Sequence, residues 1–346
     1  GNRQNYDGCD ASCQYEVVTR VSAMSISSAA APSMCTPSTN RLGAQVFSST
    51  ALDQLNPILQ DEINQGGANS FVQFLGLDDL TGTNDPDFFV RISGGEIDPA
   101  QGSWPGNSAV DGWYLAAAAA PAPMVAAVAG RSVTAGPSDF VFPAQLGGAP
   151  LLLDVLAGRL FATVAATPAP NLPAPPPSAM DPNLTVFREV NATGNNLGIC
   201  GNVTAASLAQ IPVPEALTTG TTACAACPGT SRTYTYCGAG NPVGPGCNSL
   251  LDVVVSGCRV PILGCGVSLG VVTPSQPDVA GPGAGAVTQL IPNSSNGKVT
   301  VSPDNRDGYS AFFKIDLRRQ HFTGKRCTTA AQCDSGQVCT AAGLCQ

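Results

Sequence analysis

The chain has 346 residues, of which 43% are hydrophobic and only 12% charged, and its formal net charge is −8. An average soluble protein carries roughly 25% charged residues, so uncharged polar side chains and glycine must form much of this surface. The basic residues form no stripe, which argues against a nucleic-acid partner, and the most apolar run, residues 115–130, falls short of the ~20 residues that span a bilayer.

The chain begins with a polar segment, residues 1–16, which contains Cys9 and Cys13. A strand is predicted next, over residues 17–26, because this run is rich in Val, Thr and Ser. An extended strand so near the N-terminus is suited to completing the sheet of a neighbouring copy of the chain.

Residues 51–65 give the clearest helix prediction. Five aliphatic side chains recur there at helical spacing and share one face. Thr50 is expected to cap the N-terminus of this helix, and Gly66 with Gly67 is expected to end it. Pro57 lies inside the pattern and is expected to kink or divide the helix.

Strands are predicted at residues 70–77 and 88–93, and an acidic loop lies between them. A loop dense in Asp and Asn supplies several oxygen ligands of the kind that Ca²⁺ prefers. The spacing fits no EF-hand, and the same residue types are typical of a solvated turn, so calcium binding and a plain turn both stay open. The candidate calcium ligands are Asp78, Asp79, Asn84, Asp85 and Asp87.

Residues 150–165 are apolar and fit either a helix or a strand. Residues 166–180 are rich in proline and are predicted to form an extended crossover loop, in preference to a linker between domains. Residues 200–265 form a cysteine-rich insertion, with short helices predicted at 204–211 and 248–256.

The C-terminal part of the chain is predicted to contain strands at residues 298–301 and 309–317. Residues 327–346 form a separate module whose four cysteines are spaced six residues apart. Twenty residues are too few to build a hydrophobic core, so two disulfides must hold this module. Four cysteines allow three pairings, and the sequence does not choose among them.

Fourteen cysteines are present, and an even number fits complete pairing. A reducing cytosol does not sustain that many disulfides, so the predicted location is extracellular or on the outer cell surface. Zinc is disfavoured because the only CxxC motif has no second ligand pair at zinc spacing. The predicted disulfide cysteines are Cys9, Cys13, Cys35, Cys200, Cys224, Cys227, Cys237, Cys247, Cys258, Cys265, Cys327, Cys333, Cys339 and Cys345.

The segment GVSLG, residues 266–270, fits the GxSxG pattern of a nucleophile elbow. It would make Ser268 the nucleophile and His321, the only histidine, the base of a catalytic triad. An elbow needs a helix directly after the serine, whereas Pro274 and Pro277 follow here. A non-catalytic protein is therefore expected, with a secreted serine hydrolase as an alternative.

Two terminal segments resemble known sequence modules. The N-terminal NRQNYDGCDASCQYE resembles the second half of the myxobacterial cysteine-rich repeat, although Tyr6 replaces the usual glycine. The repeat's earlier cysteines would precede Gly1, so the partners of Cys9 and Cys13 stay open. The C-terminal CTTAAQCDSGQVCTAAGLCQ resembles the four-cysteine modules of myxobacterial secreted proteins.

The body of the chain is similar, more loosely, to uncharacterised lipoproteins and exported proteins of myxobacteria. The fragments that carry this similarity are FVQFLGLDDLTGTNDPDF, LGICGNVTAASLAQIP, LLDVVVSGC, SQPDV and DGYSAFFKI. The resemblance implies the myxobacterial cell exterior as the location and implies no activity.

These observations predict a mainly β fold, a β-sandwich of jelly-roll type with a few short helices, and α+β as the alternative. The predicted organisation is a partial repeat at 1–16, a β-rich body at 17–326 and the terminal module at 327–346. The predicted function is structural or adhesive at the cell surface, for example as the subunit of an extracellular fibre, through self-association or a polysaccharide partner. A Ca²⁺-dependent module that binds polysaccharide or protein is the first alternative.

Overall fold

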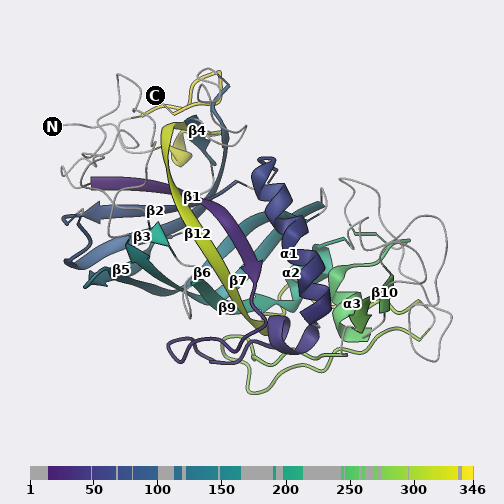
Figure 1. The fold of residues 1–346 in the computed structure, drawn as a ribbon. Helices are drawn as coiled ribbons and strands as arrows, with labels where there is room; N and C mark the ends of the chain where they lie inside the picture. The colour runs from purple at the N-terminus through teal and green to yellow at the C-terminus, as the bar shows by residue number, and fades with distance from the viewer. Residues whose placement is uncertain are drawn as a thin grey trace.

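The computed structural model describes most of the chain, and Figure 1 shows its elements. The described residues are 15–47, 49–67, 69–79, 81–99, 113–118, 122–146, 149–164, 190–191, 198–212, 243–244, 246–256, 259–261, 268–271, 274–294, 296–333 and 337–345. The strands are β1 (Tyr15–Ile26), β2 (Ser70–Leu77), β3 (Asn84–Ile97), β4 (Trp113–Ala116), β5 (Met124–Ala129), β6 (Ser132–Leu146), β7 (Ala149–Val164), β8 (Val190–Asn191), β9 (Gly198–Thr204), β10 (Arg259–Pro261), β11 (Ser268–Val271) and β12 (Gly308–Lys325). The helices are the π-helix η1 (Arg41–Val46), α1 (Ser49–Asn64), α2 (Ala205–Gln210), α3 (Leu250–Ser256) and the 3-10 helix η3 (Ala330–Gln332). The predicted mainly β fold with a few short helices is confirmed.

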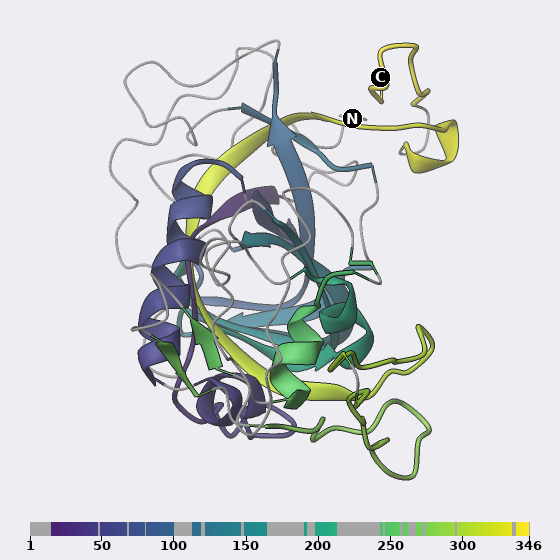
Figure 2. The same ribbon diagram turned by 90° about the vertical axis from the view of Figure 1, so that its right-hand side faces the viewer.

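Ten of these strands form one continuous sheet that closes on itself. Antiparallel pairing runs from β1 through β2, β3, β5, β6, β7 and β9 to β12, and β12 pairs back with β1. Val18 in β1, for example, is opposite both Gln73 in β2 and Gln320 in β12. Figure 2 shows these strands arranged around a common interior. Every strand of the circuit thus has a strand neighbour on both sides over at least part of its length, and the circuit contains no edge strand.

Helix α1 takes the place of a strand beside the second half of β1. Strand β2 pairs with β1 only as far as Arg20, and α1 lies along the edge that β2 leaves. Asn56 accepts a hydrogen bond from Ile26 N–H at 2.8 Å and donates one to Ile26 O at 3.2 Å, and Gln60 donates to Ser22 O at 3.0 Å. These side-chain amides supply the bonds that a neighbouring strand would otherwise supply.

The interior of the closed sheet is the main hydrophobic core. Strand β5 shows the alternation that builds it, because Met124, Ala126 and Val128 are buried while Val125 is 63% exposed. The apolar face of α1 joins the same core, and each of its leucines contributes about 2 kcal/mol by leaving water. The buried aliphatic residues of α1 are Leu52, Leu55, Leu59 and Ile63.

A second sheet layer covers part of the outer face. Strand β4 pairs antiparallel with the end of β3 and in parallel with the end of β12. Between this layer and β1–β2 lies a small core in which the ring of Phe71 is 4.8 Å from the rings of both Tyr114 and Phe322. Two stacked layers, as in the predicted sandwich, are present in this part of the molecule.

The helix predicted at residues 51–65 is confirmed as α1. Gly66 has a φ of 75°, and its N–H and that of Gly67 bind carbonyls of the last turn, so the two glycines end the helix as expected. The predicted cap was wrong, because the helix already begins at Ser49 and Thr50 lies within it. Pro57 lies inside α1, which continues on both sides of it.

Most other predicted elements are also present. The ambiguous run at 150–165 is a strand, β7, and the helices predicted at 204–211 and 248–256 are α2 and α3. The strand predicted at 309–317 is the middle of the longer β12. The predicted acidic loop was too long, because its last four residues already belong to β3.

The strand predicted at 298–301 was wrong. Val299 forms only a single bridge, with Pro292. Its N–H is instead bound by the carboxylate of Asp252 in α3 at 2.7 Å, so this segment is held by a side chain and not by a sheet.

All seven cysteines in the described part of the chain are disulfide-bonded. Cys35 pairs with Cys200 across a sequence separation of 165 residues, and the terminal module contains Cys327–Cys339 and Cys333–Cys345. The predicted cysteines outside the described residues are Cys9, Cys13, Cys224, Cys227, Cys237, Cys258 and Cys265. The partial repeat up to residue 14 and the proline-rich crossover at 166–180 also lie outside them. None of the described helices has the length and apolar character needed to cross a membrane.

Candidate functional site

The predicted calcium loop is a tight turn between β2 and β3 in which Asp79 accepts four hydrogen bonds. Its Oδ1 accepts from the backbone N–H and the hydroxyl of Thr81 at 2.8 and 2.6 Å, and its Oδ2 accepts from Thr83 N–H and Asn84 N–H at 2.8 and 2.9 Å. Burial is the largest single influence on the pKa of Asp79 and raises it, but these hydrogen bonds outweigh burial and hold the pKa below its usual value.

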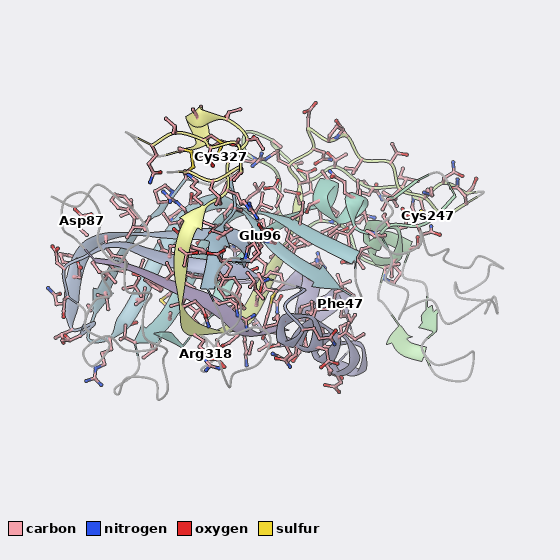
Figure 3. The ribbon with its side chains drawn as sticks, turned by 90° about the horizontal axis from the view of Figure 1, so that it is seen from above. Phe47, Asp87, Glu96, Cys247, Arg318 and Cys327 are labelled. Atoms are coloured by element: carbon pink, nitrogen blue, oxygen red, sulfur yellow. A yellow bond between two sulfur atoms is a disulfide. The ribbon has the colours of Figure 1, made fainter. Side chains whose placement is uncertain are left out.

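Asp85 is the second organising carboxylate of this turn. It is 3% exposed and accepts hydrogen bonds from Asp78 N–H at 2.7 Å and Asp87 N–H at 3.3 Å. Of the five predicted residues, Asp78 and Asp79 lie between β2 and β3, and Asn84, Asp85 and Asp87 lie at the start of β3. Figure 3 places Asp87 at the opposite end of the molecule from Cys247. A bound Ca²⁺ would compete with backbone N–H groups for the same oxygens, and calcium binding stays a prediction.

Ser268 and His321 lie in different sheets. Ser268 begins β11, which pairs with β10, whereas His321 lies in β12 opposite Trp113 of β4. The chain continues from Ser268 as a strand to Val271, while a nucleophile elbow requires a helix directly after its serine. The nucleophile elbow of the alternative hydrolase hypothesis is therefore not formed at Ser268.

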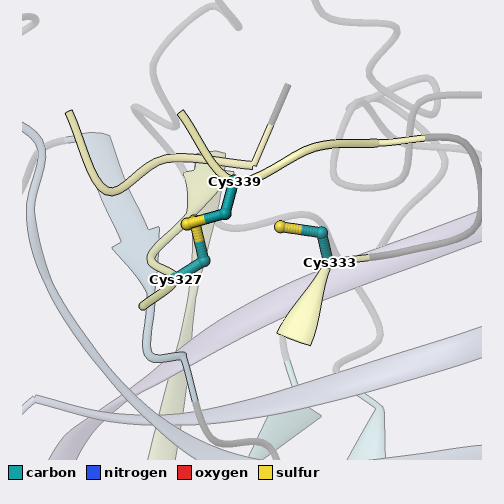
Figure 4. Close-up of side chains that lie close together, drawn as sticks. All are labelled: Cys327, Cys333 and Cys339. Carbon is teal, nitrogen blue, oxygen red and sulfur yellow. A yellow bond between two sulfur atoms is a disulfide. The ribbon is translucent and has the colours of Figure 1, made fainter. Parts of the chain in front are cut away.

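Three sulfur atoms of the terminal module lie close together. Those of Cys327, Cys333 and Cys339 are all within 4.8 Å of one another, and Figure 4 shows Cys333 beside the Cys327–Cys339 bond. Each of these cysteines is disulfide-bonded. Metal ions bind the thiolate form of cysteine, so the closeness of these atoms reflects two adjacent disulfides.

A further feature, which the sequence did not indicate, is an open groove of about 680 Å³. Its two walls are residues 281–291 and 300–307, and we call it the 281–307 groove. This volume lies within the roughly 300–1,000 Å³ of known ligand pockets. The uncharged polar side chains that line it are Thr288, Gln289, Thr300, Ser302 and Asn305.

The buried carboxylate of Asp307 joins the two walls. It is 3% exposed, and its two oxygens accept hydrogen bonds from Gly281 N–H at 2.8 Å and Thr288 N–H at 2.7 Å. Gly281 is required at this approach, because a Cβ there would lie 2.8 Å from the Cβ of Arg306. Burial alone would raise the pKa of Asp307, but hydrogen bonds from Gly281, Thr288 and Asn305 outweigh it and lower the pKa.

Two more side chains fix the walls to the body of the protein. Gln276 accepts from Leu290 N–H at 2.7 Å and donates to Leu290 O at 2.9 Å. Asp252, 2% exposed in α3, holds Val299 N–H just before the second wall. The groove therefore rests on buried and partly buried hydrogen bonds, although its walls contain no helix or strand before β12.

The only cation among the groove's lining residues, Arg306, is already paired. Its guanidinium lies 2.8 Å from the carboxylate of Asp139 in β6, and both side chains are about half exposed. The pKa of nearby Asp154 in β7 is raised, chiefly by burial. Arg306 opposes this rise and Asp139 adds to it. The groove itself also contains the carboxylates of Asp304 and Asp307, so it offers no unpaired positive charge to an anion.

The chain matches no protein-family model, and comparisons with curated proteins and with solved structures also find no match.

Proposed function

We propose that this chain is an adhesive or structural protein of the cell exterior that works by binding. The observation that carries the proposal is the complete pairing of the described cysteines, in the body as well as in the terminal module. Disulfides persist in oxidising environments and are rare in the cytosol. The low content of charged residues and the resemblance of both termini to myxobacterial exported proteins support the same location.

A role in binding is favoured over catalysis by the arrangement of the candidate residues. Ser268 and His321 belong to separate sheets, and the nucleophile elbow is not formed. The 281–307 groove instead offers uncharged polar groups on a rigid support, which suits recognition of a partner molecule.

Assembly into a fibre would have to use surfaces other than β1. The sequence suggested that the strand at 17–26 completes a neighbour's sheet, but β1 is paired with β12 on one side and with β2 and then α1 on the other. A subunit joint in the described part of the chain would therefore involve sheet faces, loops or the small β10–β11 sheet, which stands outside the closed circuit.

The location is tested by counting thiols and by labelling intact cells of the source organism. We expect alkylation of the denatured, unreduced native protein to modify no cysteine, and reduction to expose the fourteen cysteines of this chain. A reagent that cannot enter cells should label the protein on intact cells. Several free thiols together with protection from labelling would contradict the proposal.

The adhesive role is tested with purified full-length protein. We expect it to bind the surface of intact cells, or to form regular assemblies in negative-stain electron microscopy. Protein that remains monomeric and binds no cell surface would refute an adhesive or structural role even if it is exported.

A further inference from the structure

We infer that the 281–307 groove binds an uncharged sugar chain. The inference rests on the proposed role at the cell exterior and names the ligand class of that role. It depends on three properties of the groove: the chemistry of its lining, its rigidity and its charge.

The lining offers hydrogen-bonding groups of the kind that match sugar hydroxyls. Side-chain hydroxyls and amides both donate and accept hydrogen bonds, and a sugar presents hydroxyls that do the same. Thr288, Gln289, Thr300 and Ser302 are all exposed, on both walls, and Asn305 is half-buried between them. An extended ligand that runs along the groove would meet polar groups from both sides.

Hydrogen bonds from three side chains hold the backbone of the groove. The described residues of 274–307, which are all but residue 295, form no helix or strand, and a loop of this length in a compact domain is usually functional unless it is a linker or disordered. Asp307, Gln276 and Asp252 nevertheless pin its backbone through five hydrogen bonds of 2.7–2.9 Å. A preformed groove spares a ligand the cost of ordering the protein on binding.

The charges of the groove disfavour anionic ligands. Arg306 is paired with Asp139, and Asp304 and Asp307 add negative charge. The whole chain carries a net charge of −8, which repels phosphate-rich or acidic polymers. An uncharged ligand meets none of this repulsion.

A peptide is also a poorer match than a sugar. Peptide grooves commonly offer an unpaired strand edge or apolar pockets for side chains. The walls at 281–291 and 300–307 contain no strand, and the exposed large apolar residue of the lining is Ile291. None of the lining residues is aromatic, so we expect weak binding to one short sugar segment and stronger binding to a polymer that several molecules engage at once.

The test is affinity electrophoresis of the folded full-length protein in native gels that contain soluble α-glucan, β-glucan, mannan or galactan. Dextran sulfate and a random-sequence peptide conjugate serve as the anionic and peptide probes. The groove variant Gln289→Ala/Thr300→Ala removes one exposed polar group from each wall. The matched control Thr134→Ala/Thr163→Ala removes exposed threonines from β6 and β7, outside the groove lining.

We expect at least one neutral polysaccharide to retard the wild-type protein and the control equally. The groove variant should bind it about tenfold more weakly, since each lost neutral hydrogen bond reduces affinity several-fold. Equal retardation of all three proteins, no retardation by any neutral polysaccharide, or binding of only the anionic or peptide probe would overturn the inference. Protein that in those cases still binds intact cells or forms regular assemblies would leave the proposed function standing, whereas protein that also remains monomeric and binds no cell surface would refute both.

Discussion

At the scale of single residues, Asp307 decides whether the two walls of the 281–307 groove stay together. Asn in its place keeps the size of the side chain but has only one accepting oxygen, so either Gly281 N–H or Thr288 N–H loses its partner. A buried donor without a partner costs about 1–3 kcal/mol. We expect Asp307→Asn to lower the free energy of unfolding in urea by that amount. The exposed Asp304→Asn is the matched control and should change it by less than about 0.5 kcal/mol.

The same carboxylate makes stability depend on pH. Because the pKa of Asp307 is lowered in the folded protein, its stabilising contribution is complete above the unfolded value of 3.8. The contribution is lost as the pH falls from there through the lower folded pKa. Urea unfolding between pH 5 and about pH 2 should therefore show a steeper loss for the wild type than for Asp307→Asn. Identical pH profiles of the two proteins would mean that Asp307 does not hold the walls in its charged form.

The groove could not be predicted from the sequence because it is held by buried polar side chains that bind backbone groups far away along the chain. Residues 304–308 look like an ordinary turn, and the contact of Asp307 with Gly281 spans 26 positions. Asn40 gives another example, because its buried amide binds Ser27 O, Ala29 O, Gly43 N–H and the distant Phe312 N–H. Nothing in local composition marks an amide or carboxylate that serves a remote backbone segment. The length of the segment before the strand at 309–317 could have drawn attention to it, but the strand predicted at 298–301 divided that segment.

At the scale of elements, α1 covers the edge of β1, and Asn56 binds both backbone groups of Ile26 at that edge. Asn56→Leu would keep the branched shape of the side chain and its number of heavy atoms but leave both Ile26 N–H and Ile26 O without their partner. We expect the free energy of unfolding, measured by thermal or urea denaturation, to fall by about 2–4 kcal/mol. As a control, Asp53→Ala at an exposed position of the same helix should change the free energy of unfolding by less than about 0.5 kcal/mol. Comparable losses for the two variants would show that helix propensity, and not the bonds to β1, governs this element.

Individual elements were predictable because their signals are local. The helix at 51–65 and the strand at 70–77 follow from periodicity and from flanking glycines, and both agree with the structure within two residues. Closure of the sheet was not predictable, because it depends on pairing β1 with β12, residues some 300 positions apart, as in Val18 with Gln320. Alternation within a strand says which face is buried but does not say which strand lies beside it.

At the scale of the whole molecule, one disulfide secures the closed sheet from outside. Cys35 precedes η1, Cys200 lies in β9, and their bridge packs with Phe161 of β7 and Phe312 of β12 on the outer face. The bridge therefore ties the loop after β1 to strands that complete the circuit. The two disulfides of the terminal module close much shorter segments, each with a sequence separation of 12 residues.

These positions predict unequal consequences of removing disulfides. A bridge that closes a long loop restricts the unfolded chain most, so Cys35→Ala/Cys200→Ala should cost the body about 2–5 kcal/mol in urea unfolding followed by near-ultraviolet circular dichroism. Cys333→Ala/Cys345→Ala should leave that transition within about 0.5 kcal/mol, since the module has no core of its own, and should instead expose residues 327–345 to protease. If both double variants destabilise the body equally, the closed sheet depends on the terminal module. If loss of Cys35–Cys200 leaves the body unaffected, strand pairing alone keeps the sheet closed.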